Sequence, residues 1–478
     1  MDRPNAWLNY QFEETEELES VAQQYRAFLD AGKTERECVA EIVRLAEAEG
    51  YRDLADILRE GKVLTAGDKV YAVCMKKTIA LFQIGKKSLT EGMNILCAHI
   101  DSPRLDIKQN PLFEENELAY LDTHYYGGVK KYQWVTLPLA IHGVVAKKDG
   151  SLIQVKIGED ENDPVVYITD LLIHLSSKQL QKKAAEVIEG EKLDILIGSR
   201  PLSKDNAQDD DEKKKNKKDS EKKIKDAVKK QILKLLQDKY GMEEEDFLSA
   251  ELEIVPAGKA RECGLDRSMI AAYGQDDRVC AFTSYLALAH TREAMEKTSC
   301  CLLVDKEEIG SVGATGMQSR FFENTVADLA NACGMSAESA LRHILSSCRM
   351  LSSDVSAGFD PSYAEAFEKN NAAYLGHGIV LNKYTGSRGK SGSNDANAEY
   401  VAVLRRIFDE NKICFQTAEL GKVDYGGGGT IAYIAALYGM EVIDSGVAVL
   451  SMHAPWEITS KADIYEAYKA YKAFLKEA

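Results

Sequence analysis

Apolar positions in the first hundred residues alternate between helical and strand-like spacing. A capping box of Thr34 and Glu37 predicts the start of a helix, and Gly50 is placed where that helix would end. Short apolar runs that suit buried strands follow at residues 70–74, 79–84 and 95–98. Helices that alternate with buried strands in this way indicate a layered α/β domain.

The pattern changes over residues 112–262, where strand-like segments occur without regular helices between them. These segments are residues 141–145, 152–157 and 165–168. The helix–strand alternation resumes after residue 262 and continues to the end of the sequence. We therefore predict one α/β domain, residues 1–111 and 263–478, interrupted by an inserted, mainly β domain.

Residues 203–223 of the inserted domain are almost entirely polar, with many lysines and aspartates. Such a segment buries too little apolar surface to offset the entropy that ordering would cost, so we interpret it as a mobile surface insertion. The alternative, a basic arm that binds nucleic acid, is disfavoured because acidic residues interrupt the lysines.

The overall composition excludes several classes of protein. Of 478 residues, 60 are Lys or Arg and 76 are Asp or Glu, so the formal net charge is −16. This charge disfavours nucleic acid and anionic membranes as partners. No apolar run reaches the roughly 18 residues of a membrane span, and the acidic first residues do not resemble a signal peptide. Ten scattered cysteines without a C-x-x-C pair are typical of reduced thiols, which predicts a cytoplasmic protein.

Charged side chains end four apolar runs that are far apart in the sequence. In open α/β sheets, ligands bind beyond the carboxyl ends of the strands, so these side chains can converge on one site. Taken singly, each has a structural alternative: a solvated turn, a structural histidine or a helix cap. Their equivalent positions in the fold favour a shared function. The four places are His99 with Asp101, Glu307 with Glu308, Asp354, and His453.

The residue types at these places favour a metal site. Histidine and carboxylate ligands without thiolates suit zinc, manganese or cobalt. Asp101 is on the same face of an extended segment as His99, where it can accept the second imidazole N–H. Glu307 and Glu308 point to opposite faces of a strand-like segment, so one can bind metal while the other transfers protons.

Six short motifs, in their order and spacing, resemble the aspartyl aminopeptidase and vacuolar aminopeptidase I family of co-catalytic metallo-aminopeptidases. The resemblance spans nearly the whole chain. The motifs are AHIDSP (98–103), YGG (126–128), GQDDR (274–278), DKEEIGS (305–311), SSD (352–354) and SMHAPWE (451–457).

The resemblance implies two divalent metal ions per subunit, with zinc as the expected metal and cobalt or manganese as alternatives. Glu307 corresponds to the family's general base, and Asp101 to the carboxylate that orients a histidine ligand. The implied metal ligands are Asp276, shared by both ions, His99 and Asp354 at one ion, and Glu308 and His453 at the other.

The resemblance also implies a fold and an assembly. The α/β domain is expected to be a three-layer α/β/α proteolytic domain with a mixed sheet, and the inserted domain to mediate dimer contacts. Dimers in this family assemble into a hollow dodecamer, so we expect a homo-oligomer that acts on peptides. A free α-amine of the substrate would bind near the metals, which implies removal of one residue at a time from the N-terminus.

Two segments depart from the family pattern. Family members carry a histidine in the inserted domain that reaches a neighbouring active site, and Tyr132 is at that position here. Members that prefer acidic N-terminal residues have a lysine where this chain has Asn382, with Lys383 one position later, so the sequence does not define a cationic pocket. Gly428, in the GGGGT segment, belongs either to a close backbone approach to substrate or to a flexible turn.

Together these features predict a metal-dependent aminopeptidase of the cytoplasm, with peptide substrates and no nucleic-acid or membrane partner. The nearest alternative is another co-catalytic metallohydrolase, a deacylase or a carboxypeptidase. A catalytically vestigial, self-assembling particle is the alternative from another class.

Overall fold

The computed structural model describes residues 4–203, 226–386 and 388–478, and the chain divides into two compact units. The first comprises Met1–Ser102 and Lys259–Ala478, and the second Pro103–Gly258. The boundary that we expected after residue 111 falls inside strand β5 (Arg104–Glu115). This strand contains many polar residues, so it does not form a continuous apolar run that can be recognised in the sequence. The charged segment expected at 203–223 lies outside the described residues, apart from Ser203.

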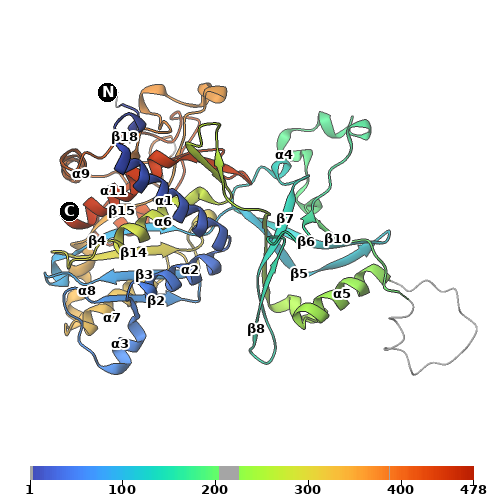
Figure 1. Ribbon diagram of the computed structural model, residues 1–478, viewed down its shortest axis with the longest axis horizontal. Helices are drawn as coiled ribbons and strands as arrows, with labels where there is room; N and C mark the ends of the chain where they lie inside the picture. The colour runs from blue at the N-terminus through green and yellow to red at the C-terminus, as the bar shows by residue number, and fades with distance from the viewer. Residues whose placement is uncertain (1–3, 204–225, 387) are drawn as a thin grey trace, which may run out of the picture. The chain divides into compact units, whose positions relative to one another are not determined.

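A nine-stranded sheet forms the middle of the first unit (Figure 1). In spatial order its strands are β1 (Arg52–Asp53), β2 (Lys69–Cys74), β3 (Thr78–Gln83), β14 (Thr298–Val304), β4 (Met93–His99), β15 (Arg349–Ser352), β19 (Glu441–Gly446), β17 (Ile379–Asn382) and β18 (Phe415–Thr417). The central strands β14, β4, β15 and β19 are parallel, whereas β3 and β17 run antiparallel to β14 and β19. The sheet is therefore mixed, as predicted.

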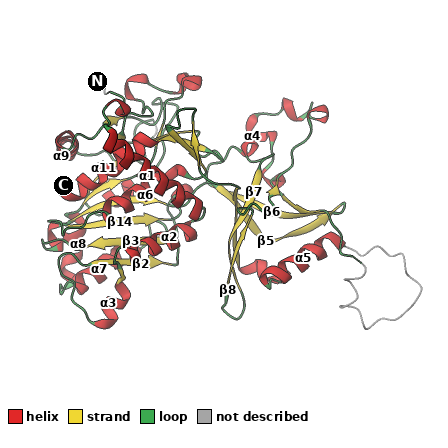
Figure 2. Cartoon of the chain, viewed as in Figure 1, coloured by secondary structure: helices red, strands yellow, loops and turns green. Residues whose placement is uncertain are grey.

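Helices cover both faces of this sheet (Figure 2). Those that pack on one face are α1 (Phe12–Ala31), α2 (Glu35–Ala48), α6 (Gln275–Ala289), α9 (Ala398–Glu410) and α11 (Lys461–Glu477). Those on the other are α3 (Leu54–Glu60), α7 (Phe321–Ala332), α8 (Ala337–Ser346) and α10 (Ala432–Ala436). Alternate residues of β4 enter the two cores, Leu96 and Ala98 in one and Ile95 and Cys97 in the other. The three-layer α/β/α fold is confirmed.

A second sheet of the first unit holds two segments that matter for the site. Its strands, in spatial order, are β12 (Arg261–Cys263), β13 (Met269–Ala272), β21 (Glu457–Ser460), β20 (Ala448–Leu450) and β16 (Ser356–Ala357). Asp276 follows β13 at the start of α6, and His453 lies in the turn between β20 and β21. Because β13 and β21 are paired antiparallel, these two segments are held beside each other.

The second unit is mainly β. Its elements are β5, β6 (Leu118–Tyr126), β7 (Pro138–Ala146), β8 (Leu152–Ile157), β9 (Val166–Tyr167), β10 (Ile195–Gly198), β11 (Ala250–Pro256), α4 (Ala184–Val187) and α5 (Ala227–Tyr240). The strand order is β11-β5-β6-β10-β9-β7-β8, and a further pairing of β11 with β7 closes six of the strands into a ring. Three of these strands, β7, β8 and β9, correspond to apolar segments predicted from the sequence. The dimerisation role of this unit stays a prediction.

Local signals in the sequence correspond to local structure in the first unit. Thr34 and Glu37 form both bonds of the capping box at the start of α2. Strands β2, β3 and β4 coincide with three predicted apolar runs to within two residues at each end. All ten cysteines are free thiols. Among the described residues, no helix is both long and apolar enough to cross a bilayer.

Candidate metal centre

The predicted site residues of the first unit lie at the ends of its strands. Because β14, β4 and β15 are parallel neighbours, their carboxyl ends meet at one edge of the large sheet. His99 ends β4, with Asp101 just beyond, and Asp354 follows β15. Glu307 and Glu308 begin a single 3-10 turn, η8 (Glu307–Ile309), beyond β14. The smaller sheet adds Asp276 and His453 from the segments described above.

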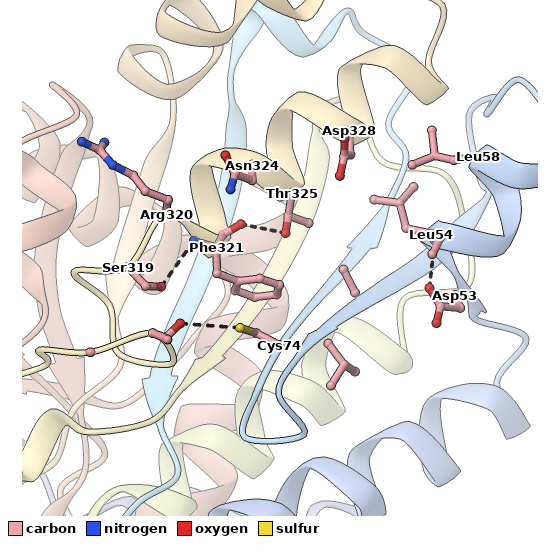
Figure 3. A pocket seen from close by; sticks show the side chains of 15 residues that line it. Asp53, Leu54, Leu58, Cys74, Ser319, Arg320, Phe321, Asn324, Thr325 and Asp328 are labelled. Atoms are coloured by element: carbon pink, nitrogen blue, oxygen red, sulfur yellow. Dashed lines mark hydrogen bonds between the residues drawn. The ribbon is translucent and has the colours of Figure 1, made fainter. Parts of the chain in front are cut away.

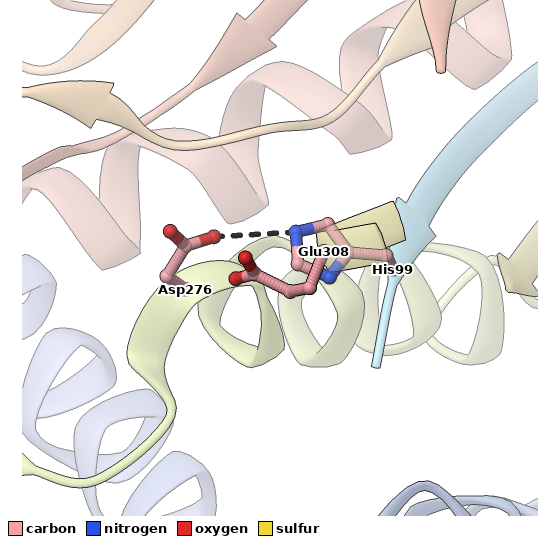
Figure 4. Close-up of side chains that lie close together, drawn as sticks. All are labelled: His99, Asp276 and Glu308. Atoms are coloured by element: carbon pink, nitrogen blue, oxygen red, sulfur yellow. Dashed lines mark ion pairs between the residues drawn. The ribbon is translucent and has the colours of Figure 1, made fainter. Parts of the chain in front are cut away.

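The carboxylate of Asp276 lies between the two histidines. Its Oδ1 is 3.2 Å from Nε2 of His99, and its Oδ2 is 3.2 Å from Nε2 of His453. The same nitrogen of His453 is 3.5 Å from Oε1 of Glu308. Potential ligand atoms of His99, Asp276 and Glu308 all lie within 4.8 Å of one another (Figure 4). One carboxylate therefore faces two sets of ligands, which is the geometry of a bridging group.

A second group of potential ligands contains Asp277, which is not among the ligands predicted from the sequence. His99, Asp277 and Asp354 also offer atoms within 4.8 Å of one another. The backbone N–H of His99 donates to Oδ2 of Asp277 at 3.3 Å. Both aspartates at the start of α6 have non-helical backbone angles, so their side chains do not follow helical spacing. The adjacent aspartates of GQDDR were the available signal, but spacing alone did not place Asp277.

Asp101 contacts both His99 and the turn that carries the two glutamates. Its carboxylate is 3.3 Å from Nδ1 of His99, and its backbone carbonyl oxygen is 3.0 Å from the same nitrogen. The carboxylate also accepts the backbone N–H groups of Glu307 and Glu308, each at 3.2 Å. The residue thus supports two parts of the site, whereas the sequence predicted only its contact with the histidine.

Three buried carboxyl groups of the site resist ionisation. Burial raises the pKa of Glu308, Asp277 and Asp354 well above their ordinary values, and the charge of a neighbouring carboxylate adds to each shift. Among the described residues, Oε1 of Glu308 and Oδ1 of Asp277 have no hydrogen-bond partner. Divalent cations would favour the ionised forms and provide a partner for each of these oxygens. The donor set therefore fits a metal ion.

Asp276 and His99 show the opposite behaviour. Although burial opposes the ionisation of Asp276, hydrogen bonds from His453 and His99 lower the pKa of its carboxyl below the usual range. Burial alone would lower the pKa of His99, but its bonds to Asp101 and Asp276 raise it well above the ordinary value. The side chain of His453 is 35% exposed, compared with 5% for that of Asp276, so solvent reaches the cluster at His453.

Glu307 has the electrostatic surroundings of a proton-transfer group. Burial raises the pKa of its carboxyl to about 7, against the opposing influence of His99. A carboxylate with a pKa near neutrality can accept a proton and release it again in one reaction cycle.

The predicted substrate-binding residues are not all gathered at the cluster. Asn382 ends β17, where it is buried and donates to Oγ of Ser356 at 3.3 Å. Lys383 is half-exposed, and its Nζ is 3.7 Å from Asp395. In the GGGGT segment, a Cβ at Gly426 would lie only 2.2 Å from a backbone oxygen, while one at Gly428 would make ordinary contacts. Gly426 therefore packs closely against the backbone of Leu420, and the approach of this segment to substrate stays a prediction.

Tyr132 belongs to the second unit. It lies in the short 3-10 turn η3 (Lys131–Gln133), and 43% of the residue is exposed. The residue is therefore accessible from solvent within its own unit.

A separate cavity of about 610 Å³ lies between α3, β2 and α7 of the first unit (Figure 3). Its charged lining residues are Asp53, Arg320 and Asp328, and none of the predicted site residues lines it. Within the described part of the chain, no cluster of three or more potential metal ligands is found there. The potential metal ligands are instead those at the ends of the strands.

Comparison with known proteins adds independent information. A family model described as "Aminopeptidase I zinc metalloprotease (M18)" matches residues 28–475. A probable M18 family aminopeptidase 1 from Clostridium acetobutylicum is 60% identical, over 98% of this chain and 97% of that protein. The crystal structure of an M18 aminopeptidase from Thermotoga maritima superimposes with a TM-score of 0.92 at 43% identity, covering 100% of both chains. A more distant structure, the mApe1 dodecamer of S. cerevisiae, has a TM-score of 0.73 at 20% identity, covering 95% of this chain and 96% of that one.

Proposed function

This chain belongs to the M18 family of aminopeptidase I zinc metalloproteases, and we propose that it removes N-terminal residues from peptides by hydrolysis at a binuclear metal centre. Family membership makes it a zinc-dependent hydrolase of the aminopeptidase class. It also favours this activity over a deacylase, a carboxypeptidase or a vestigial particle. The observation that carries the binuclear proposal is the carboxylate of Asp276, whose two oxygens face two different histidines at 3.2 Å each.

The proposed ligands are five residues with suitable chemistry and spacing. Asp276 would be shared by both ions, with zinc as the expected metal and cobalt or manganese as alternatives. Asp277 is a further candidate, since its carboxylate is grouped with His99 and Asp354. Bound zinc would acidify a water molecule and polarise the carbonyl group of the scissile peptide bond. Besides Asp276, the proposed ligands are His99 and Asp354 at one ion, and Glu308 and His453 at the other.

Glu307 is proposed as the general base, and later the general acid. Its carboxylate takes a proton from the attacking water as the new C–O bond forms, then delivers that proton to the nitrogen as the C–N bond breaks. The products are an amino acid and a peptide shortened by one residue, and no covalent enzyme intermediate is needed. Burial raises the pKa of this carboxyl, which favours its role as a proton acceptor.

Asp101 is proposed to hold this machinery in place. Its contact with Nδ1 of His99 fixes which imidazole nitrogen faces Asp276. Its bonds to the N–H groups of Glu307 and Glu308 hold the two glutamates at the end of β14. The role in substrate binding stays a proposal for all four predicted residues, which are Tyr132, Asn382, Lys383 and Gly428.

We also propose that the protein is a homo-oligomer of dimers, built through the mainly β second unit and acting in the cytoplasm. The dodecamer of the yeast relative supports this assembly. Sedimentation of the purified protein should show a mass many times that of one chain, and a monomer at micromolar concentration would contradict it.

The function is tested by two measurements on the purified enzyme. Elemental analysis should find up to two divalent ions per chain, and removal by a chelator should abolish hydrolysis until metal returns. Peptides with a free α-amine should be cleaved, whereas the same peptides with an acetylated N-terminus should not be. Equal cleavage of both sets would exclude an aminopeptidase.

A further inference from the structure

Glu457, the first residue of β21, is not among the proposed ligands or proton-transfer groups. It is only 1% exposed, although its side chain is acidic. Oε2 accepts the backbone N–H of Asp276 at 3.1 Å, and Oε1 accepts the backbone N–H of His453 at 2.7 Å. Asp276 is 181 residues away along the chain, and His453 is four residues away. One carboxylate therefore joins the two segments that the smaller sheet supplies to the site.

These bonds close a ring of interactions around the metal cluster. The side chains of Asp276 and His453 meet at 3.2 Å, and their backbones are both bonded to Glu457. The separation of the two ligand side chains is thus restrained both by their direct contact and by the bonds of their backbones to Glu457. A buried side chain that accepts a backbone N–H at each of its two oxygens fixes the positions of both donors.

The backbone of His453 needs such support. The φ angle of His453 is 65°, in the left-handed region that residues other than glycine rarely adopt. This conformation belongs to the turn that directs the imidazole toward Asp276. The bond from the His453 N–H to Oε1 of Glu457 stabilises the turn at the residue that has the unfavourable backbone angle.

Glu457 is itself held in place by a buried network. Its backbone pairs with that of Ala272 in the β13–β21 ladder, and its carbonyl oxygen accepts from Nε2 of Gln275 at 2.7 Å. The Gln275 side chain in turn accepts from the hydroxyl of Tyr25 at 3.3 Å. These bonds fix the backbone from which the Glu457 side chain reaches Asp276 and His453.

We propose that Glu457 is a positioning residue, which does not bind metal itself but fixes Asp276 and His453 at the separation that a metal ion requires. The inference rests on the proposed ligand role of those two residues. It predicts that the affinity for metal, and not stability alone, depends on the carboxylate of Glu457.

The test is Glu457→Gln, which keeps the shape of the side chain but leaves a single oxygen to accept. One of the two backbone N–H groups would then face an amide N–H instead of an acceptor. We expect the zinc-loaded variant to release metal to a competing chelator at about tenfold to a hundredfold lower chelator concentration than the wild type. The visible absorption spectrum of the cobalt-substituted variant should change as well, because the ligand geometry changes.

Asp463→Asn is the matched control. Asp463 in α11 is also fully buried, and its two oxygens accept the backbone N–H groups of Gly376 and Gly378 at 2.7 Å each. The control removes the same kind of interaction at a place without proposed ligands. It should lower the melting temperature, but leave the chelator titration and the cobalt spectrum as in the wild type.

The outcomes separate the possible explanations. Wild-type chelator resistance and a wild-type cobalt spectrum in Glu457→Gln would overturn the inference while leaving the proposed function intact. A wild-type protein that holds no metal would instead overturn the proposed function. If Glu457→Gln does not fold, Glu457→Asp keeps the charge on a shorter side chain and should show the same direction of change. Unchanged metal affinity in that variant would overturn the inference equally.

Discussion

The carboxylate of Asp101 lies 3.2 Å from the backbone nitrogen of Glu307, a residue 206 positions later in the chain. The oxygen that makes this bond is also the one that lies 3.3 Å from Nδ1 of His99. The orientation of a proposed metal ligand and the position of the proposed base therefore depend on one side chain. We therefore expect a change at Asp101 to affect both metal binding and turnover.

The first prediction concerns Asp101. In Asp101→Asn, one of the two oxygens that accept from the glutamate turn becomes an N–H donor, so the turn loses a bond and Nδ1 of His99 loses its anionic partner. We expect a loss of about tenfold to a hundredfold in metal affinity, in kcat, or in both. Chelator titration and steady-state kinetics measure the two effects.

Asp305→Asn provides the control for this variant. Asp305 is also buried, and it accepts the hydroxyl of Thr315, a bond that an asparagine oxygen can keep. The metal affinity of the Asp305→Asn variant should stay within about twofold of that of the wild type. Equal losses in the two variants would show that Asp101 acts only through the stability of the region.

The second prediction separates the two adjacent glutamates. Glu307→Gln should retain metal but lose turnover by roughly 10² to 10⁴, because an amide cannot accept the proton of the water. Glu308→Gln should lose metal as well, since Glu308 is a proposed ligand. Metal analysis and kcat of both variants, prepared side by side, test the assignment. Near-normal turnover in Glu307→Gln would remove Glu307 from the mechanism.

The third prediction concerns the preference for N-terminal residues. Lys383 is half-exposed and lies 3.7 Å from Asp395, so its charge is screened and partly neutralised. Lys383→Ala should therefore change the ratio of kcat/KM for Asp-amide and Leu-amide substrates by less than about threefold. Lys390→Ala is the control, because Lys390 is paired with the same aspartate at 3.1 Å. A tenfold loss confined to the acidic substrate would assign Lys383 to the substrate pocket.

The apolar runs of the sequence were sufficient to predict the layers of the first unit. Strands such as β4 are buried on both faces, so they are continuous apolar segments whose ends are easy to locate. Strand β5 was not located in the same way, because several of its residues are polar and partly exposed. For this reason the expected boundary after residue 111 lies inside β5, whereas the two units divide between Ser102 and Pro103.

The site was only partly predictable, because some of its geometry comes from distant contacts. The ends of the apolar runs predict that His99, Glu308 and Asp354 lie at one edge of a sheet. The roles of Asp277 and Gly426 could not be found in this way. Asp277 depends on non-helical backbone angles at the start of α6, and Gly426 on the approach of a backbone oxygen from Leu420. Neither feature leaves a periodic signal in the sequence.

The fourth prediction is a pH dependence of stability that originates at Asp444 in β19. This residue is 2% exposed, and burial raises the pKa of its carboxyl to about 7, against the opposing effect of the Thr430 and Ser352 hydroxyls. The same carboxyl titrates near pH 4 in the unfolded chain, so its contribution to stability is complete below pH 4 and is lost as the pH rises through 7. Asp444→Asn cannot ionise, and it should be more stable than the wild type at pH 8 by up to roughly 4 kcal/mol, with a much smaller difference at pH 5. Thermal unfolding of both proteins at the two pH values, with the exposed-site variant Asp395→Asn as control, measures this change. An equal difference in melting temperature at pH 5 and pH 8 would show that Asp444 is ionised in the folded protein at both.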